Sequence, residues 1–307
     1  MKKFIALLLA ALMCMSVFSA LAEIPEEKKP VETELDGGVV VSMHTFNAKI
    51  YEAECEQPGT IERLDYTTAV YGDGVTYEQW ANVYLPYGYD PANKYNILYF
   101  FHGTNETQNS FIAEPVVKNV IDNMIYYGVC DPFIIVCPTY YYVYEGRVVN
   151  HQVFPQEVRN DLMPAVESKY ATFAETADDA GFAASREHRA FAGLSRGAVT
   201  TANSVLCGSL DYFSRFGLFS SFRTTEEHIR ETIRSEEQLP LSIDYLYATT
   251  GNFDFATPYM APGYRMLCEL EPRLQEGVNT SFDIFPMRYH SIGHWHLSLY
   301  NFLQKVF

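Results

Sequence analysis

The apolar positions of this chain form short unbroken runs that alternate with stretches of helical periodicity. The runs are rich in branched and aromatic residues and are bounded by turn residues, which is typical of buried strands. They lie at residues 95–101, 133–137, 245–249 and 281–285. The periodic stretches, which predict helices, lie at residues 115–127, 155–170, 264–274 and 297–306. This alternation predicts an α/β fold in three layers, with a mostly parallel central sheet flanked by helices on both faces.

Residues 1–22 have the pattern of a signal peptide. Lys2 and Lys3 precede an apolar run, and small residues stand at Ala20 and Ala22, the two positions that a signal peptidase reads. We therefore expect cleavage after Ala22 and secretion from a bacterial cell; the alternative is that this segment stays as a membrane anchor. No other segment has the roughly 20 consecutive apolar residues that a membrane-spanning helix needs, so we expect no membrane association after cleavage.

The rest of the chain is expected to form one catalytic domain at residues 61–307, because no low-complexity linker or internal repeat divides it. Residues 23–60 have weaker periodicity and are expected to be an N-terminal extension that adds edge strands. The formal net charge of the chain is −16, and it becomes −18 when Lys2 and Lys3 are removed. This acidic balance opposes binding to nucleic acid and to anionic membrane surfaces, and it suits a neutral polymer or a small ester.

The cysteines of the mature chain give no sign of a metal site or a disulfide framework. Their number is odd, and none of them stands in a C-x-x-C pair or beside a pair of histidines. Cys130 and Cys137 flank a predicted strand, and the extended length of that strand, roughly 20 Å, is too great for a bridge. The sequence therefore predicts neither a zinc site nor a stabilising set of disulfides.

A Gly-Leu-Ser-Arg-Gly segment at residues 193–197 lies between an apolar run and a helix-like stretch. In this setting a G-x-S-x-G pentapeptide is typical of a nucleophile elbow, a tight strand-to-helix turn that displays the serine. The N-terminus of the following helix favours the negative charge that develops during the reaction. Ser195 is therefore the candidate nucleophile of a serine hydrolase.

A serine hydrolase also needs a base to take the proton of the serine and a carboxylate to orient that base. In α/β-hydrolases the acid and then the histidine follow the serine along the chain. We expect His294 to be the base, because it follows Gly293 in a loop between the predicted strand at 281–285 and the last helix. The alternatives are His290, interpreted as a solvated loop residue, and His296, interpreted as a residue at the start of the helix.

Asp254 is the expected acid. It follows the predicted strand at 245–249, and it therefore lies at the carboxyl-terminal edge of the sheet, where open α/β sheets build their sites. The alternative interpretation of Asp254 is a turn residue or a helix cap. Asp244 and Asp283 lie at or within predicted strands and are less suitably placed.

The tetrahedral intermediate of acyl transfer needs two backbone N–H groups that point at its oxyanion. Arg196, the residue after the nucleophile, is expected to supply the first. Gly103 or Thr104 is expected to supply the second, from the loop after the predicted strand at 95–101. His102 is expected to hold this turn in place rather than to take part in catalysis.

These segments together resemble the first carbohydrate esterase family, whose members include feruloyl esterases and acetylxylan esterases and which is related to esterase D. The likeness covers roughly residues 60–307 and is carried by residues 83–90, 97–103, 189–197, 250–254 and 293–295. The resemblance implies the α/β-hydrolase fold, with Ser195 as nucleophile, Asp254 as acid and His294 as base, and it implies no metal ion or organic cofactor. This chain departs from the family pattern at Arg196, whose side chain could crowd or charge the substrate pocket.

The substrate is expected to be an ester of plant cell-wall polysaccharide or oligosaccharide. Aromatic residues make up 15% of the chain, and Tyr140 and Tyr141 follow a predicted strand at the edge where the site is expected. With Trp295 they are candidates for contacts with a phenolic ring or a sugar face; the alternative for the tyrosines is packing within their own domain. Together with the resemblance, this pattern favours a secreted feruloyl esterase that releases hydroxycinnamic acids from feruloylated xylan by a Ser-His-Asp acyl-enzyme mechanism.

Other functions fit the same residues. An acetylxylan esterase, or another carbohydrate acyl esterase, would act on acetylated polysaccharide and would need only a shallow acyl pocket. A protein of another class would be an inactive carbohydrate-binding protein that keeps the fold, and the presence of Ser195, Asp254 and His294 argues against it. A peptidase of the same fold is disfavoured, because no propeller or lid domain precedes the hydrolase core.

Overall fold

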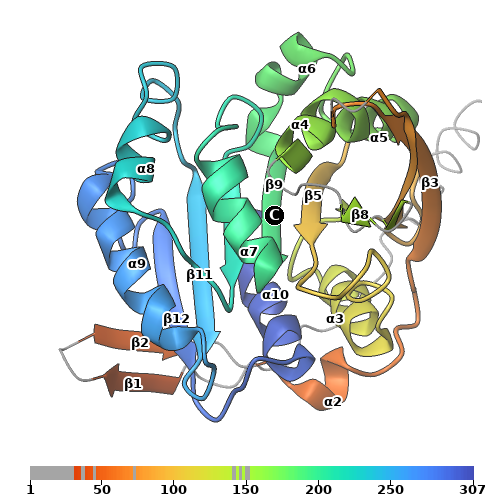
Figure 1. Cartoon of the computed structure of the whole chain (residues 1–307). Coiled ribbons are helices and arrows are strands. Elements are labelled where there is room, and N and C mark those ends of the chain that lie inside the picture. Colours follow the sequence, from red (N-terminus) through yellow and green to blue (C-terminus); the bar gives the residue numbers. More distant parts are fainter. Residues whose placement is uncertain are drawn as a thin grey trace, which may run out of the picture.

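An eight-stranded sheet forms the centre of the computed structural model (Figure 1). The structure describes residues 31–35, 39–43, 46–71, 74–139, 143–144, 147–148 and 153–307. The strands of the sheet are β3 (Thr60–Thr68), β4 (Tyr77–Leu85), β5 (Asn96–Phe101), β6 (Phe133–Cys137), β9 (Arg189–Leu194), β10 (Arg215–Phe219), β11 (Tyr245–Gly251) and β12 (Thr280–Phe285). Their spatial order is β12-β11-β10-β9-β5-β6-β4-β3. Neighbouring strands from β12 to β6 are parallel. β4 pairs antiparallel with β6, and β3 pairs antiparallel with β4.

Helices cover both faces of this sheet, which confirms the predicted three-layer α/β fold (Figure 1). One face carries α2 (Ala48–Tyr51), α3 (Pro115–Tyr126) and α10 (Ile292–Val306). The other carries α4 (Phe154–Glu157), α5 (Met163–Lys169), α6 (Asp179–Ala184), α7 (Arg196–Thr200), α8 (Glu226–Glu231) and α9 (Thr257–Leu270). Turns of π-helix continue two of these helices: η2 (Val158–Leu162) joins α4 to α5, and η4 (Thr201–Leu206) extends α7.

The burial of each strand follows its place in the sheet. β6 and β9 are buried along their whole length, as expected for parallel strands with helices on both sides. β3 stands at the edge, and from Arg63 to Thr68 its residues alternate between exposed and buried. The apolar runs of the sequence therefore mark β5, β6 and β11 within the sheet and β12 at one edge, but they do not mark β3 at the other edge.

Two small sheets lie outside the central one. β1 (Val31–Leu35) pairs with β2 (Val39–Met43), within the segment that was expected to add edge strands. Among the described residues these two strands hydrogen-bond only with each other, and the edge strand of the central sheet, β3, starts at Thr60. β7 (Val143–Tyr144) and β8 (Arg147–Val148) form the second small sheet.

Two helices begin earlier than the sequence pattern predicts. α9 begins at Thr257 rather than at 264, although Pro262 and Gly263 stand inside it. Tertiary packing overrides these helix breakers: a Cβ on Gly263 would come within 2.6 Å of the Phe222 ring, so the glycine allows a close contact. α10 begins at Ile292 rather than at 297, and this difference places two histidines in a helix instead of a loop.

A buried ion pair anchors the start of β9. The guanidinium of Arg189 donates two hydrogen bonds to Glu167 of α5, both of 2.8 Å, and both side chains are at most 1% exposed. Arg189 also donates to the carbonyl oxygens of Phe182 and Tyr212 at 2.9 Å and to the hydroxyl of Ser185 at 2.8 Å. The pair thus joins α5 and α6 to the amino-terminal end of the strand that leads to Ser195.

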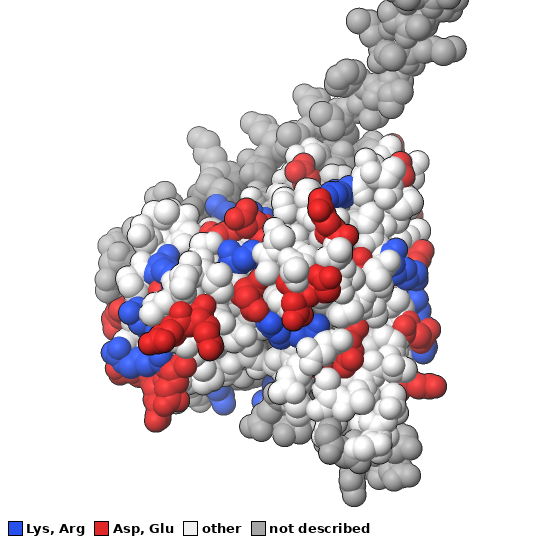
Figure 2. All heavy atoms as spheres, turned by 90° about the horizontal axis from the view of Figure 1, so that it is seen from above, with Lys and Arg blue, Asp and Glu red and all other residues white. Residues whose placement is uncertain are grey.

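The surface reflects the acidic composition of the chain. Figure 2 shows the face at the top of Figure 1, where acidic side chains cover more of the surface than basic ones do. In the part of the chain that the structure describes, no helix has the length and apolar character needed to cross a membrane.

Removal of one partner of the buried pair is expected to destabilise the fold strongly. Glu167→Ala leaves the guanidinium of Arg189 buried without its carboxylate, and we expect the free energy of unfolding to fall by about 3–5 kcal/mol. Urea unfolding followed by circular dichroism measures this loss. The control is Glu175→Ala, which breaks the exposed pair with Lys94 and should leave the stability nearly unchanged. Equal losses in the two variants would contradict the anchoring role of Arg189.

Candidate active site

Ser195 stands on a sharp turn between β9 and α7. Its backbone angles are φ 52° and ψ −113°, a conformation that a residue with a side chain adopts only under constraint. A Cβ on Gly197 would lie 2.1 Å from the carbonyl oxygen of Phe101, and a Cβ on Gly193 would lie 2.5 Å from the carbonyl carbon of Gly197. Because only glycine fits at either position, the helix can begin directly against the sheet. The predicted strand-to-helix turn is therefore present, with Ser195 half-buried at the carboxyl-terminal edge of the sheet.

Asp254 lies at the same edge, just after β11. Nδ1 of His290 lies 2.9 Å and 3.1 Å from the two oxygens of its buried carboxylate. The N–H of Ala256 donates to the carboxylate at 2.8 Å, and the hydroxyl of Ser220 also bonds it. Burial alone would raise the pKa of Asp254, but these hydrogen bonds outweigh burial and hold the pKa below its usual value. The ionised carboxylate therefore keeps a proton on Nδ1 of His290, and Nε2 is left to act as a base.

Ser195 and Asp254 are connected through the end of β10. The N–H of Ser195 donates to the carbonyl oxygen of Phe219, the last residue of that strand, at 2.8 Å. The next residue, Ser220, bonds Asp254 and accepts a hydrogen bond of 3.0 Å from the indole N–H of Trp295. The nucleophile and the acid–histidine pair are thus gathered by the ends of β9, β10 and β11 and by the loop between β12 and α10.

The structure contradicts the prediction that His294 is the base. Because α10 begins at Ile292, His294 lies in the first turn of the helix with its ring fully buried. The ring packs against Phe285 with 5.3 Å between centroids, and Nε2 lies 3.3 Å from the hydroxyl of Ser298. Burial lowers the pKa of His294 to about 3, so this ring is neutral and enclosed by the core. His290, the alternative in the loop, is the histidine that pairs with the acid.

Two further histidines, His102 and His296, are buried and contact groups outside the pair of Asp254 and His290. Nδ1 of His102 donates to the carbonyl oxygen of Gly103 at 2.8 Å, and Nε2 accepts from the hydroxyl of Thr139 at 2.7 Å. Burial lowers the pKa of His102 to about 4, and the neutral ring holds the turn after β5, as the sequence predicts. His296 is buried in α10 with Nε2 at 3.2 Å from Glu52, and burial lowers its pKa to about 4.

The turn after β5 lies against the nucleophile. A Cβ on Gly103 would come within 3.3 Å of Cβ of Ser195, and the N–H of Gly103 donates to the carboxylate of Glu106 at 2.6 Å. Burial raises the pKa of Glu106. Gly103 can therefore serve an oxyanion, as the sequence predicts, only after Glu106 moves. The amides of Thr104 and Arg196 have no hydrogen-bond partner within the described part of the chain, so they remain available.

Exposed aromatic side chains surround the histidine of the pair. Phe255 is 64% exposed, and its ring lies 4.2 Å from the ring of His290. Phe253 and Tyr289 are also more than half exposed and stack on each other at 5.3 Å. Met287, 70% exposed, belongs to the same segment. These residues could not be recognised in the sequence, because nothing in the local pattern distinguishes a surface phenylalanine from a core one.

Of the three residues predicted to contact the substrate, the structure describes only Trp295. Trp295 is buried, and its ring packs edge-on against His290 at 5.1 Å while its N–H bonds Ser220. Trp295 therefore packs against His290 as a buried residue and does not line a substrate surface, contrary to the prediction. Tyr140 and Tyr141 lie outside the described residues.

The side chains that could bind a metal ion are scattered within the described residues. In that part of the chain no three His, Cys, Asp or Glu side chains gather so that they could hold a metal ion. Cys130 and Cys137 are separate buried thiols, and burial raises the pKa of each.

The sequence is similar to known esterase sequences. A family model with the description "Putative esterase" matches residues 77–228. Endo-1,4-beta-xylanase Y of Acetivibrio thermocellus is 42% identical over 167 residues, which cover 54% of this chain and 14% of that protein. The endo-1,4-beta-xylanase/feruloyl esterase of Xylanibacter ruminicola is 27% identical over 184 residues, 57% of this chain and 23% of that protein. The chain thus spans less than a quarter of the length of either relative.

The structure is similar to solved esterases over almost its whole length. A mutant of the feruloyl esterase module from Clostridium thermocellum, complexed with sinapinate, is 31% identical with a TM-score of 0.74, and the match covers 92% of this chain and 96% of that one. A CE1 ferulic acid esterase of the anaerobic fungus Anaeromyces mucronatus shares the fold, with a TM-score of 0.67, 20% identity and coverage of 87% and 98%.

The pairing of Asp254 with His290 predicts a large loss of kcat in one of two matched variants and little change in the other. We expect His290→Gln to lower kcat for 4-nitrophenyl acetate by at least about a thousandfold, because the serine loses its base. We expect His294→Gln to keep kcat within about tenfold of the wild-type value, since its ring lies in the core. Circular dichroism checks that both variants fold. Loss of turnover in His294→Gln with retention in His290→Gln would reverse the assignment.

Burial of His294 also predicts a pH dependence of stability. The pKa of this ring is about 3 in the folded protein, against an ordinary value of 6.5 in the unfolded chain. The unfolded chain therefore takes up the proton first as the pH falls, so the contribution to stability is complete above pH 6.5 and is lost toward pH 3. We expect the midpoint of urea unfolding to fall from pH 7 to pH 5, and to fall less in His294→Gln. Identical slopes in the two proteins would contradict this.

Proposed function

The chain belongs to the carbohydrate esterase family of carboxylic ester hydrolases that includes feruloyl esterases and acetylxylan esterases, and we propose that it is a secreted feruloyl esterase. In this proposal it releases hydroxycinnamic acids from feruloylated xylan, or from oligosaccharides of the plant cell wall. The names of the xylanase relatives and the sinapinate bound to the similar esterase module support this substrate class. The observation that carries the proposal is the group of exposed aromatic side chains beside His290.

The proposed mechanism uses Ser195 as nucleophile and His290 as base. Nε2 of His290 takes the hydroxyl proton while the serine oxygen attacks the ester carbonyl carbon, and the carbonyl electron pair moves to oxygen. The tetrahedral intermediate then collapses, and the sugar alcohol leaves with the proton from His290. Water attacks the acyl-enzyme in the same way, which releases the carboxylic acid and restores the serine. Asp254 stabilises the protonated ring through Nδ1, and the amides of Arg196 and Thr104 face the developing oxyanion.

The aromatic side chains favour a phenolic acyl group over a small one. A hydroxycinnamoyl group carries a planar ring, and planar rings stack on exposed aromatic side chains such as Phe255. Phe253 and Tyr289 extend this apolar surface next to the same loop. An acetyl group is too small to stack on such a surface, so in an acetyl ester these rings can contact only the sugar.

Secretion is inferred from the sequence of residues 1–22, which lie outside the described residues. Its small residues at Ala20 and Ala22 and its apolar run support export, with the polysaccharide met outside the cell. Plant cell-wall polysaccharide is too large to enter a bacterial cell, so the export signal and the proposed substrate agree.

Hydrolysis of methyl ferulate beside 4-nitrophenyl acetate tests the proposal. We expect the mature chain to hydrolyse both, and Ser195→Ala to hydrolyse neither. We expect Phe255→Ala to raise KM for methyl ferulate by about tenfold, because a stacked ring is lost, and to leave acetate hydrolysis nearly unchanged. Hydrolysis of acetate alone would favour the acetylxylan esterase. Inactivity on both, with retained affinity for xylan, would favour the carbohydrate-binding protein.

A further inference from the structure

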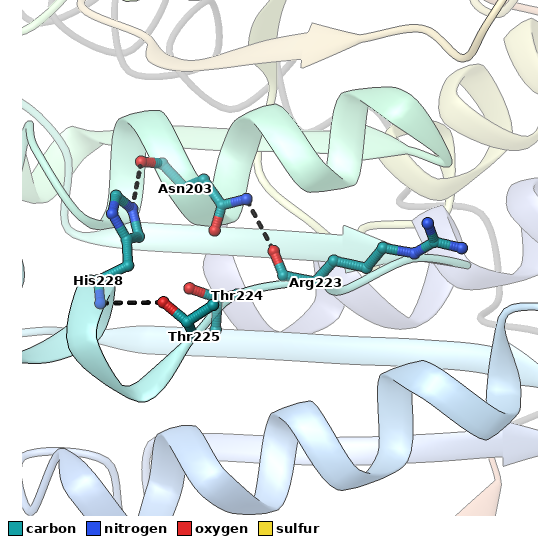
Figure 3. Close-up of a pocket in the computed structure, with 5 residues that line it drawn as sticks. All are labelled: Asn203, Arg223, Thr224, Thr225 and His228. Carbon is teal, nitrogen blue, oxygen red and sulfur yellow. Dashed lines mark hydrogen bonds between the residues drawn. The ribbon is translucent and has the colours of Figure 1, made fainter.

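A pocket lies next to the helix that follows the nucleophile (Figure 3). Its volume is about 420 Å³. Three elements supply its walls: η4 behind the nucleophile helix, the segment that follows β10, and the start of α8. The lining residues are Asn203, Arg223, Thr224, Thr225 and His228. None of these residues belongs to the catalytic arrangement.

Hydrogen bonds among the lining residues fix the walls of this pocket, and two of their side-chain oxygen atoms form none within the described part of the chain. Asn203 donates through its amide nitrogen to the carbonyl oxygen of Arg223 at 2.7 Å, and His228 donates to the carbonyl oxygen of Asn203 at 3.1 Å. The N–H of His228 is held by the hydroxyl of Thr225 at 3.1 Å. Oδ1 of Asn203 and Oγ1 of Thr224 are buried and have no partner among the described residues. Both atoms are enclosed by the protein, so a ligand at this pocket meets the exposed side chain of Arg223 and not these oxygens.

An exposed stacked pair borders the pocket. The guanidinium of Arg223 lies 4.8 Å from the centre of the Tyr259 ring, and Tyr259 is 56% exposed. In Figure 3 the Arg223 side chain extends away from Asn203 and His228. The pair therefore adds an aromatic ring and the N–H donors of a guanidinium at the border of the pocket.

The pocket is continuous with the catalytic site along two segments of chain. Ser220, which bonds Asp254, precedes Arg223 by three residues, a span of at most about 11 Å. Tyr259 follows Phe255, the ring that stacks on His290, by one turn at the start of α9. The segment after β10 and the start of α9 thus both lead from the catalytic site toward the pocket.

We propose that this pocket and Tyr259 bind a sugar residue of the polysaccharide to which the ester is attached, at a distance from the ester itself. This inference rests on the proposed function. A sugar ring matches the surface because one face of C–H groups stacks on an aromatic ring, while its hydroxyl oxygens accept hydrogen bonds from the arginine. Arg223 is the one lysine or arginine in the lining of a chain with net charge −16, which suits a neutral sugar better than a polyanion.

The test compares a short ester with an oligosaccharide ester. Kinetics are measured on methyl ferulate and on a feruloylated arabinoxylan oligosaccharide, with Arg223→Ala, Tyr259→Ala and Thr224→Val. We expect KM for the oligosaccharide to rise by about tenfold in the first two variants, with kcat unchanged, because a stacking contact is lost. Both constants for methyl ferulate should stay at the wild-type values. Thr224→Val keeps the side-chain shape and removes an oxygen that is enclosed by the protein, so it should leave KM for both substrates unchanged.

Two control variants remove the same types of side chain, an arginine over an aromatic ring and an exposed tyrosine, far from the pocket. Arg63 also lies over an aromatic ring, 4.5 Å from the Trp80 centroid, but on the far edge strand β3. Tyr87 is 57% exposed and follows the antiparallel strand β4, at the edge of the sheet opposite to Ser195. Arg63→Ala and Tyr87→Ala should leave both substrates unaffected.

Three results would overturn the inference. Unchanged KM for the oligosaccharide in Arg223→Ala and Tyr259→Ala would show that the pocket takes no part in binding. An equal rise for both substrates would show that these residues act on the acyl group or on the fold. If the wild-type protein hydrolyses methyl ferulate but gains nothing from the attached sugars, the inference fails while the proposed function stands; no turnover of either ester would remove both.

Discussion

The close contact between the start of α7 and the strands beneath it determines where the rest of the site can stand. Gly193 and Gly197 leave no room for a Cβ, so the helix begins against β5 and β9 with Ser195 at positive φ. This strained position is supported from outside the turn. The end of β10 holds the Ser195 amide, and the buried pair of Arg189 and Glu167 anchors β9 at its other end. The geometry of the nucleophile is thus a property of the whole sheet.

The nucleophile and the acid could be predicted because each depends on local sequence: a pentapeptide at Ser195, and an apolar strand that ends just before Asp254. The base could not, because three histidines stand close together and the choice depends on where α10 begins. A start at Ile292 buries the second and third histidines and leaves His290 in the loop that faces Asp254. Glu106 and the exposed aromatic side chains reach the site only through tertiary packing, which no spacing in the sequence reveals.

The fold shows the same division between local and tertiary information. The central strands were predicted almost residue for residue, since burial on both faces produces unbroken apolar runs. β3 alternates at the edge, and β10 is short with Gly217 at its centre, so neither has a strong pattern. Gly217 is required there, because a Cβ would come within 2.7 Å of Cβ of Ala192 on the neighbouring strand. Close packing of neighbouring strands explains such residues, and it is visible only in three dimensions.

The carboxylate that covers the Gly103 amide has a consequence for the end of the catalytic cycle. An ester arrives as a neutral molecule, whereas the acid that hydrolysis produces is an anion at neutral pH. Glu106, 2.6 Å from that amide and beside Ser195, carries a like charge when it is ionised, and it repels the new carboxylate where the carbonyl group had been tolerated. In the proposed reaction, an ionised Glu106 therefore weakens the binding of the acid product relative to that of the neutral ester.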